Sequence, residues 1–245
     1  MNRFIAVAAI AVALMQAVPA SAAKNVVLVH GAFADGSGWR EVAEILEDKG
    51  YRVSVVQHPE TSLDEDVLAV KRVLAAQDGP VVLVGHSYGG IVITQAGGDP
   101  KVTALVYVAA YAPEDGESAA DLRQKMPPAS TASKRTPDGY IQLDPAQFHQ
   151  DFAADLPAKT ARFMAISQVL PNASVFSTKV SNPAWKNKPS WGIVASEDRA
   201  INPALERFMY QRGGFAVTEV KASHAVYISR PKEVAAVIVE AASRN

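Results

Sequence analysis

The stretch PVVLVGHSYGG, residues 80–90, decides the fold because it joins three local structures in a fixed order. Residues 80–84 are an apolar, valine-rich run typical of a buried strand, and the small apolar residues 89–96 suit a helix. Between them, Gly-His-Ser-Tyr-Gly places a serine in a sharp turn, where bulky neighbours would clash with the strained backbone. This strand, turn and helix predict an elbow that exposes Ser87 as a nucleophile.

The composition is that of an ordinary globular chain. It has 245 residues, 49% of them hydrophobic, and a formal net charge of −1 at pH 7. A chain of this length can bury enough apolar surface for one folded domain. Because acidic and basic residues nearly balance, no strong field would attract nucleic acid or an anionic membrane surface. We therefore expect the partner to be a small molecule.

The N-terminal segment differs from the rest of the chain. Arg3 precedes an apolar run over residues 4–18, and Pro-Ala-Ser-Ala follows at 19–22. This order predicts a secretory signal peptide over residues 1–22, cleaved at its end. The alternative, a membrane anchor, needs an apolar run of about 20 residues. We expect a periplasmic or secreted protein without a stable membrane anchor, its folded domain spanning residues 23–245. The lack of cysteine is compatible with an oxidising compartment.

Short runs rich in valine and isoleucine alternate with helical patterns along most of the chain. Such continuous apolar runs suit strands of a parallel sheet that helices cover on both faces. Residues 39–49 and 63–76 place apolar side chains at helical spacing. The alternation predicts an α/β fold with a doubly wound, mostly parallel sheet of about six strands. The expected strands are Asn25–Val29, Tyr51–Val56, Pro80–Val84, Val102–Val108, Ser190–Ala195 and Phe215–Val220.

The alternation stops between residues 111 and 187, where eight prolines divide the chain. The segment is too long for a simple loop and predicts an inserted cap of a few short helices. Its second half places Phe148, Phe152, Phe163 and Met164 at helical spacing. These side chains either form the cap's own core or line an apolar substrate pocket, to which Phe33 would also contribute.

Ser87 needs a base, because its hydroxyl is almost never ionised near neutral pH. His224 is the best candidate, since it follows the last predicted strand in a turn that can reach back over the sheet. Asp198 follows the preceding strand and would orient the imidazolium, and the order Ser87, Asp198, His224 fits this elbow. Glu197 is the competing acid. Asp198 is preferred because a carboxylate two or three residues past the strand can turn inward while its neighbour faces solvent.

A tetrahedral intermediate also requires donors for its oxyanion. One is expected to be the backbone N–H of Tyr88, directly after the nucleophile, and the other to come from the loop after the first strand. We assign the second donor to Ala32, with Phe33 as the alternative. Gly31 allows a close approach of the backbone there.

The remaining histidines are expected to have lesser roles. His30 would order the oxyanion loop through its side chain, His86 would pack behind the elbow, and His58 and His149 would lie on the surface or in loops. No set of His, Asp and Glu shows metal-ligand spacing, and the elbow glycines lack the spacing of a nucleotide-binding loop. We therefore expect neither a metal nor a cofactor.

On these motifs the chain resembles α/β-hydrolases of the plant-type methylesterase and hydroxynitrile lyase branch and its bacterial esterase relatives. The resemblance implies a parallel sheet of about six strands with a helical cap. Lyases of this branch carry a lysine directly after the catalytic histidine and a threonine after the His-Gly pair. Ala225 and Ala32 stand at those positions, so the resemblance implies an esterase. The serine in the elbow disfavours relatives with an aspartate nucleophile, such as dehalogenases. The segments that carry the resemblance are residues 27–33, 38–39, 82–90, 196–198 and 223–225.

The expected activity is hydrolysis of small or medium carboxylic esters through an acyl-enzyme on Ser87. One alternative is carbon–carbon bond hydrolysis or perhydrolysis on the same triad, which product analysis would distinguish. The other is a protein that binds a small ligand with slow or no turnover, against which the complete Ser-Asp-His set argues. The sequence leaves the substrate and the oligomeric state open.

Overall fold

A single parallel sheet organises the protein. The computed structural model describes residues 23–244, so the predicted signal peptide lies outside the described residues. The six strands have the order β2-β1-β3-β4-β7-β8, and every neighbouring pair is parallel, which confirms the predicted sheet. The strands are β1 (Asn25–Val29), β2 (Arg52–Val56), β3 (Val81–His86), β4 (Val102–Val108), β7 (Ser190–Ala195) and β8 (Ala216–Val220).

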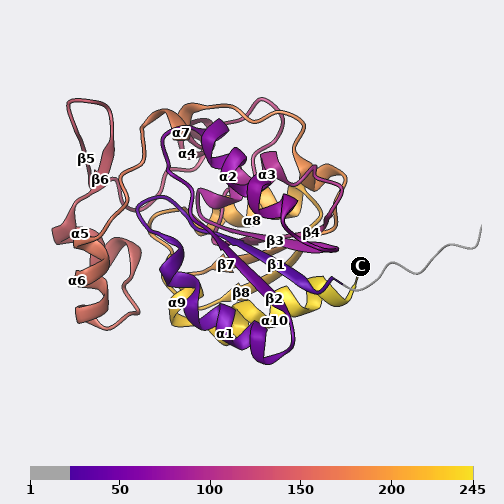
Figure 1. The fold of residues 1–245 in the computed structure, drawn as a ribbon. Helices are drawn as coiled ribbons and strands as arrows, with labels where there is room; N and C mark the ends of the chain where they lie inside the picture. Colours follow the sequence, from indigo (N-terminus) through magenta and orange to yellow (C-terminus); the bar gives the residue numbers. More distant parts are fainter. Residues whose placement is uncertain (1–22, 245) are drawn as a thin grey trace, which may run out of the picture.

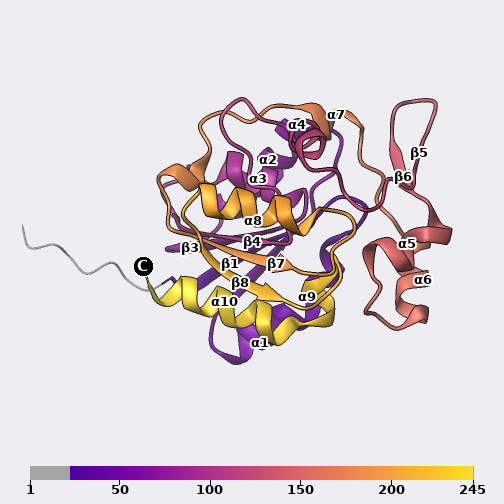
Figure 2. The ribbon, with the colours of Figure 1, turned by 180° about the vertical axis from the view of Figure 1, so that it is seen from behind.

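Helices cover both faces of this sheet, as Figures 1 and 2 show. Every residue of β1 is buried, and successive residues point to opposite faces: Val27 and Val29 pack with one set of helices, Val26 and Leu28 with the other. The continuous apolar run therefore reflects burial on two sides. One layer contains α1 (Arg40–Asp48), the short α9 (Val226–Ser229) and α10 (Pro231–Ser243), and the other contains α2 (Leu63–Ala75), α3 (Gly89–Ala96) and α8 (Pro203–Arg212).

The segment between β4 and β7 forms the cap, which extends beyond one end of the sheet (Figure 1). Besides the predicted short helices it contains an antiparallel hairpin, which the sequence analysis missed. Strand β5 is the exposed, polar Ser-Lys-Arg, so it lacks the apolar alternation that identifies a strand. The cap elements are α4 (Ala119–Lys125), β5 (Ser133–Arg135), β6 (Ile141–Leu143), α5 (Pro145–Phe152), α6 (Ala158–Ile166), α7 (Ser174–Ser177) and the 3-10 helix Ala184–Lys186.

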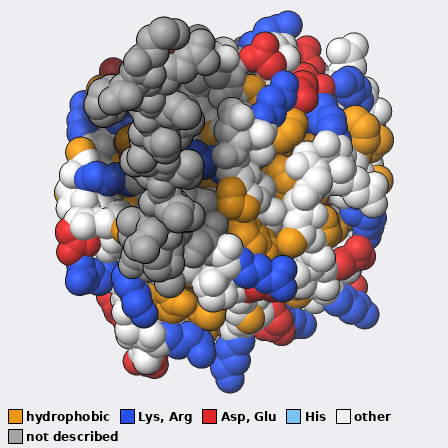
Figure 3. All heavy atoms as spheres, turned by 90° about the vertical axis from the view of Figure 1, so that its right-hand side faces the viewer, with side chains coloured by type: hydrophobic (Ala, Val, Ile, Leu, Met, Phe, Trp, Pro, Cys, Tyr) orange, Lys and Arg blue, Asp and Glu red, His pale blue; other side chains and the backbone are white. Residues whose placement is uncertain are grey.

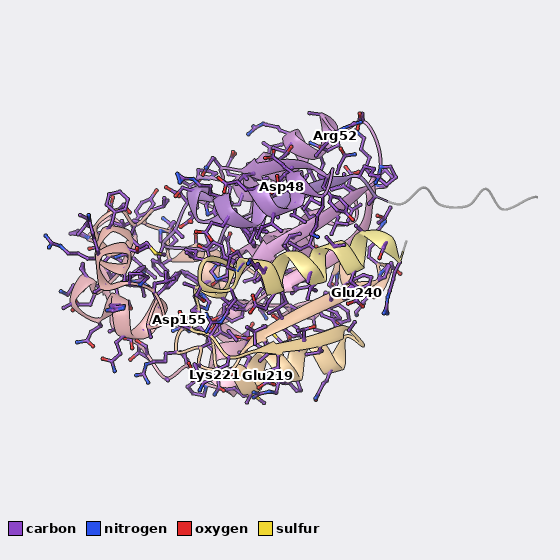
Figure 4. The ribbon with its side chains drawn as sticks, turned by 90° about the horizontal axis from the view of Figure 1, so that it is seen from below. Asp48, Arg52, Asp155, Glu219, Lys221 and Glu240 are labelled. Carbon is purple, nitrogen blue, oxygen red and sulfur yellow. The ribbon has the colours of Figure 1, made fainter. Side chains whose placement is uncertain are left out.

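The cap is tied to the loop that follows β8. The N–H of Ala225 donates to the carbonyl oxygen of Phe152 over 3.0 Å. The Ser223 hydroxyl donates to Asp155 Oδ1 over 2.5 Å, and the Ser223 N–H donates to Oδ2 over 3.2 Å. Figure 4 shows Asp155 at the boundary between the cap helices and the rest of the domain. The junction between α5 and α6 is therefore fixed relative to residue 224, which lies between the two anchored residues.

Charged side chains of both signs lie on the visible part of the face turned away from the cap (Figure 3). Within residues 23–244, no helix combines the length and the apolar character that a membrane crossing requires.

Candidate active site

The predicted elbow lies at the carboxyl end of β3. Ser87 has a φ of +53°, a left-handed conformation that non-glycine residues rarely adopt. The glycines on either side permit this turn sterically: a Cβ at Gly85 would lie 2.5 Å from the carbonyl oxygen of Gly89, and a Cβ at Gly89 would lie 2.5 Å from that of His30. The elbow thus holds Ser87 at the junction of β3 and α3.

Three side chains from separate loops meet at this elbow. The Ser87 hydroxyl lies 2.8 Å from His224 Nε2, and His224 Nδ1 lies 2.5 Å from Asp198 Oδ2. Asp198 and His224 are buried, and Ser87 is 8% exposed. The arrangement allows His224 to accept the serine proton at one ring nitrogen while the other donates to the carboxylate. The structure thus brings together the three residues that the sequence analysis chose for a triad.

The carboxylate beside His224 is that of Asp198, and Glu197 points away. Asp198 Oδ1 accepts hydrogen bonds from the N–H groups of Ala200 and Ile201, at 2.7 and 2.9 Å. Its Oδ2 is left for the imidazole. Glu197 is exposed and pairs with Lys221 at 3.6 Å. The tight turn after β7 therefore fixes the orientation of Asp198 independently of His224.

A second acid, Glu206 on α8, lies buried next to this carboxylate and was not anticipated. Its Oε2 accepts a hydrogen bond from the Ala195 N–H at 3.0 Å. Burial, and then the negative charge of Asp198, raise the pKa of Glu206 well above its usual value. The folded state thus favours the protonated form of Glu206 beside the Asp198 carboxylate. The sequence feature that could have revealed Glu206 is its position on the same helical face as the apolar Leu205 and Met209, where an acid would be buried.

Two backbone N–H groups beside the nucleophile are available as oxyanion donors. Within residues 23–244, neither the N–H of Ala32 nor that of Tyr88 donates a hydrogen bond. The N–H of Phe33, the alternative donor, is directed to Glu60 Oε2 at 3.4 Å. Free donors beside the nucleophile are what a tetrahedral oxyanion requires, so the geometry favours Ala32 over Phe33 as the partner of Tyr88.

A network of buried polar side chains is hydrogen-bonded to the loop that holds Ala32 and Phe33. Glu60 accepts from Phe33 and lies 3.4 Å from His30 Nδ1, while its own N–H donates to Asp66 Oδ1 at 2.8 Å. The other oxygen of Asp66 accepts from the Tyr88 hydroxyl at 2.7 Å. Both Phe33 and Glu60 have positive φ values, +66° and +56°. Burial raises the pKa of Glu60 to about 7, with His30 opposing the rise.

The same network corrects the interpretation of His58. This residue lies in the loop after β2, one of the two expected placements, but it is buried and not on the surface. Its ring stacks on that of His30 at 3.8 Å, with only 9° between the ring planes. His58 Nε2 donates to the His30 carbonyl oxygen over 3.0 Å. His30, His58 and Glu60 bring potential metal-ligand atoms within 4.8 Å of one another. Because imidazole binds a metal in its ring plane, two parallel stacked rings do not converge on one ion, so the cluster fits a hydrogen-bonded support.

His86 packs behind the triad, as expected. Its Nε2 donates to the carbonyl oxygen of His224 over 2.9 Å, and its ring contacts those of His224 and Tyr227. Burial lowers the pKa of His86 well below its usual value, so the ring is neutral at pH 7. His149 is exposed on α5.

Ser87 opens into a cavity of about 560 Å³ between the sheet edge and the cap. Phe33 and Phe152 line it, together with Ala32 and His224. Phe152 also packs edge-on against the His224 ring, with the centroids 4.7 Å apart. The size is within the range for small-molecule pockets, which is about 300–1,000 Å³.

Three of the aromatic and sulfur side chains expected in a pocket lie elsewhere. Phe148 is fully buried in the cap's own core, Met164 packs at the edge of that core, and Phe163 is 67% exposed. None of them lines the cavity. The cap's helical pair uses most of its apolar face for internal packing and contributes only the end of α5 to the cavity wall. The rest of the cap's share of the wall comes mainly from α4, the hairpin and α7. Polar residues that no sequence motif marked, among them Tyr111 and Arg123, are part of that wall.

The parallel sheet, the elbow and the three hydrogen-bonded side chains define a hydrolase of the α/β-hydrolase class. Residues 26–237 match the family described as "Alpha/beta hydrolase family", and the chain belongs to that family.

Relatives in this family include ester-cleaving enzymes. A carbendazim hydrolyzing esterase from Nocardioides sp. (strain SG-4G) is 37% identical over 123 residues, which cover 44% of this chain and 51% of that protein. Methylesterase 7 from Arabidopsis thaliana is 28% identical and covers 90% of this chain and 97% of its own. The crystal structure of a pyrethroid hydrolase from Sphingobium faniae JZ-2 has a TM-score of 0.78 at 25% identity, covering 90% of this chain and 97% of that one. The resemblance to plant methylesterases and bacterial esterases is thereby confirmed.

Proposed function

We propose that the protein hydrolyses small or medium carboxylic esters through an acyl-enzyme on Ser87. The observation that carries this proposal is the continuous hydrogen-bonded series from Ser87 through His224 to Asp198, with the serine lining a cavity under the cap. The names of the relatives, which are esterases and hydrolases of esters, support the same reaction class.

In the first half-reaction His224 Nε2 takes the proton of the Ser87 hydroxyl as Oγ attacks the ester carbonyl carbon. The negative charge that develops on the carbonyl oxygen is stabilised by the N–H groups of Ala32 and Tyr88. When the intermediate collapses, the carbon–oxygen bond to the alcohol breaks, and His224 returns the proton to the leaving oxygen. The acyl group remains on Ser87.

In the second half-reaction a water molecule takes the place of the alcohol. His224 accepts one of its protons, the hydroxide oxygen attacks the acyl carbon, and collapse returns the proton to Ser87 Oγ. The carboxylic acid is released and the enzyme is regenerated. Throughout, Asp198 stays ionised and stabilises the imidazolium, while the Ala200 and Ile201 N–H groups hold the carboxylate in place.

The test is the turnover of p-nitrophenyl acetate, butyrate and octanoate by the wild type, Ser87→Ala and His224→Ala, with a fluorophosphonate label as a count of reactive serines. We expect labelling of the wild type at Ser87 and a drop of roughly four to six orders of magnitude in kcat for each variant, because these residues act as one unit. A folded wild type that neither turns over nor labels would instead support the ligand-binding alternative. Labelling with acyl transfer to peroxide, or with carbon–carbon cleavage as the main product, would support the other alternative.

We also propose that the protein is exported and that residues 1–22 are removed. The proposal rests on the charge, apolar run and small-residue pattern of this segment. Mass spectrometry of protein recovered from the periplasm or medium of an expressing bacterium should show a chain that begins at residue 23. An intact N-terminus on protein confined to the cytoplasm would contradict it.

A further inference from the structure

The hydroxyl of Tyr111 has no hydrogen-bond acceptor within residues 23–244, although the residue is 98% buried. A buried hydroxyl without an acceptor costs free energy, so such groups in a binding cavity commonly serve the ligand. Tyr111 lines the cavity, and its backbone N–H donates to the Ser87 carbonyl oxygen over 3.2 Å. The backbone of Tyr111 is therefore hydrogen-bonded to that of the nucleophile, and both residues line one cavity.

Arg123 on α4 lines the same cavity. Burial raises the pKa of Tyr111, and the positive charge and hydrogen bonding of the Arg123 guanidinium oppose that rise. In the part of the chain that the structure describes, no carboxylate forms an ion pair with Arg123. Two other arginines do form ion pairs: Arg199 pairs with Asp151, and Arg212 pairs with Glu117.

The other charged groups of the cavity wall do not neutralise Arg123. Asp151 is committed to the Arg199 guanidinium at 3.0 Å and also accepts a hydrogen bond from the Ser130 hydroxyl. Arg135 on the hairpin adds a second positive charge to the wall and is exposed. The wall therefore presents an excess of positive charge, although the chain as a whole is slightly acidic.

We propose that the preferred substrates are esters that carry a carboxylate at the end of the acyl chain, held by the Arg123 guanidinium and the Tyr111 hydroxyl while the ester carbonyl lies on Ser87. This inference rests on the proposed esterase function and names its substrate class. An unpaired arginine favours an anion over a neutral carbonyl, because charge-assisted hydrogen bonds are about twice as strong as neutral ones. The hydroxyl supplies a second donor to the same carboxylate.

Matched pairs of methyl esters test the proposal, since the two members differ only in the distal charge. We would compare kcat/KM for the monomethyl and dimethyl esters of glutarate, adipate, pimelate and suberate, measured by methanol release. The wild type should prefer the monoester at one or two chain lengths, those that match the distance from Ser87 to Arg123. In Arg123→Gln the ratio of monoester to diester kcat/KM should fall about tenfold to hundredfold, and in Tyr111→Phe about fivefold to tenfold.

Arg162→Gln is the matched control, because it removes an equal charge from an exposed position on α6 that does not line the cavity. Its ratio should change less than about threefold, since an exposed charge is screened. Arg123→Lys should recover part of the preference, which also guards against misfolding of the glutamine variant.

Equal losses in Arg123→Gln and Arg162→Gln would overturn the specific site in favour of a general electrostatic field. A wild type that prefers the diester at all four lengths, while a fluorophosphonate still labels Ser87, would overturn the carboxylate preference and leave the esterase function intact. Failure of turnover and labelling together would overturn the proposed function itself.

Discussion

Replacement of Asp198 by asparagine tests the catalytic geometry most directly, because the structure dictates how the new side chain would lie. Asp198 Oδ1 accepts two backbone hydrogen bonds, from Ala200 and Ile201. Only a carbonyl oxygen can occupy that place, so the amide oxygen of asparagine would take it. The amide NH₂ would then point at His224 Nδ1, which lies 2.5 Å from the other carboxylate oxygen.

This orientation forces the wrong tautomer of the histidine. With a donor facing it, His224 Nδ1 must accept, and the ring proton moves to Nε2, which faces the Ser87 hydroxyl at 2.8 Å. The imidazole can then no longer take the serine proton. A comparable change in another serine hydrolase lowers kcat about 10⁴-fold, so we expect a loss of about 5.4 kcal/mol of transition-state stabilisation here.

The assay is kcat for p-nitrophenyl butyrate across neutral and alkaline pH, with the rate of fluorophosphonate labelling as a second readout. Glu197→Gln is the matched control: it changes the adjacent, exposed acid and should alter kcat less than about twofold. Thermal unfolding of both variants should remain cooperative. An Asp198→Asn enzyme within tenfold of the wild type, or a Glu197→Gln enzyme as impaired as Asp198→Asn, would refute the reasoning.

Three further changes test the packing and the buried network. Gly89→Ala would place a Cβ 2.5 Å from the His30 carbonyl oxygen and should lower the free energy of unfolding in urea by at least about 2 kcal/mol. Gly98→Ala is the control: a Cβ there meets open space, so stability should change by less than about 1 kcal/mol. Phe148→Ala should cost about 3–5 kcal/mol because the ring is fully buried, and Phe163→Ala less than about 0.5 kcal/mol, as measured by the same unfolding assay; equal costs would contradict the described cap packing. The folded-state pKa of Glu60 is raised from 4.5 to about 7, so folding favours the protonated carboxyl. Relative to Glu60→Gln, the wild type should therefore lose about 3 kcal/mol of unfolding free energy as the pH rises from 4.5 through 7. Parallel pH profiles of the two proteins would show that the pKa of this carboxyl is not raised.

The strands and the triad could be predicted because their signals are local. A strand buried on both faces, such as β1, shows an uninterrupted apolar run, and the turn with Ser87 carries its own sequence pattern. Once the strand order along the chain is known, parallel strands bring the loops that hold Asp198 and His224 to the same edge of the sheet. The preference for Asp198 over Glu197 used only the distance of each from its strand.

Features that depend on contacts between distant segments could not be predicted in this way. His58 precedes a proline and has the sequence context of a loop, yet its surroundings come from His30 and Asp66 on other elements. Tyr111 lies in the segment after β4 and Arg123 on α4, and neither has a local sequence pattern that marks it as a pocket residue. The cap's aromatic residues showed helical spacing, but spacing alone does not tell internal packing from a cavity wall.

The hydrogen bonds that join Phe152 and Asp155 to the residues on either side of His224 limit how this enzyme could be re-engineered. A chimera that exchanges the whole insertion for that of another esterase would bring a foreign pocket, but it would also withdraw the supports of the general base. Grafts that begin after Asp155, or that replace only the hairpin and α4, would leave those supports in place. Exchange of the hairpin, of α4 or of the segment after Asp155 can therefore change the substrate range without affecting the general base. Exchange of the segment that contains Phe152 and Asp155 would change both.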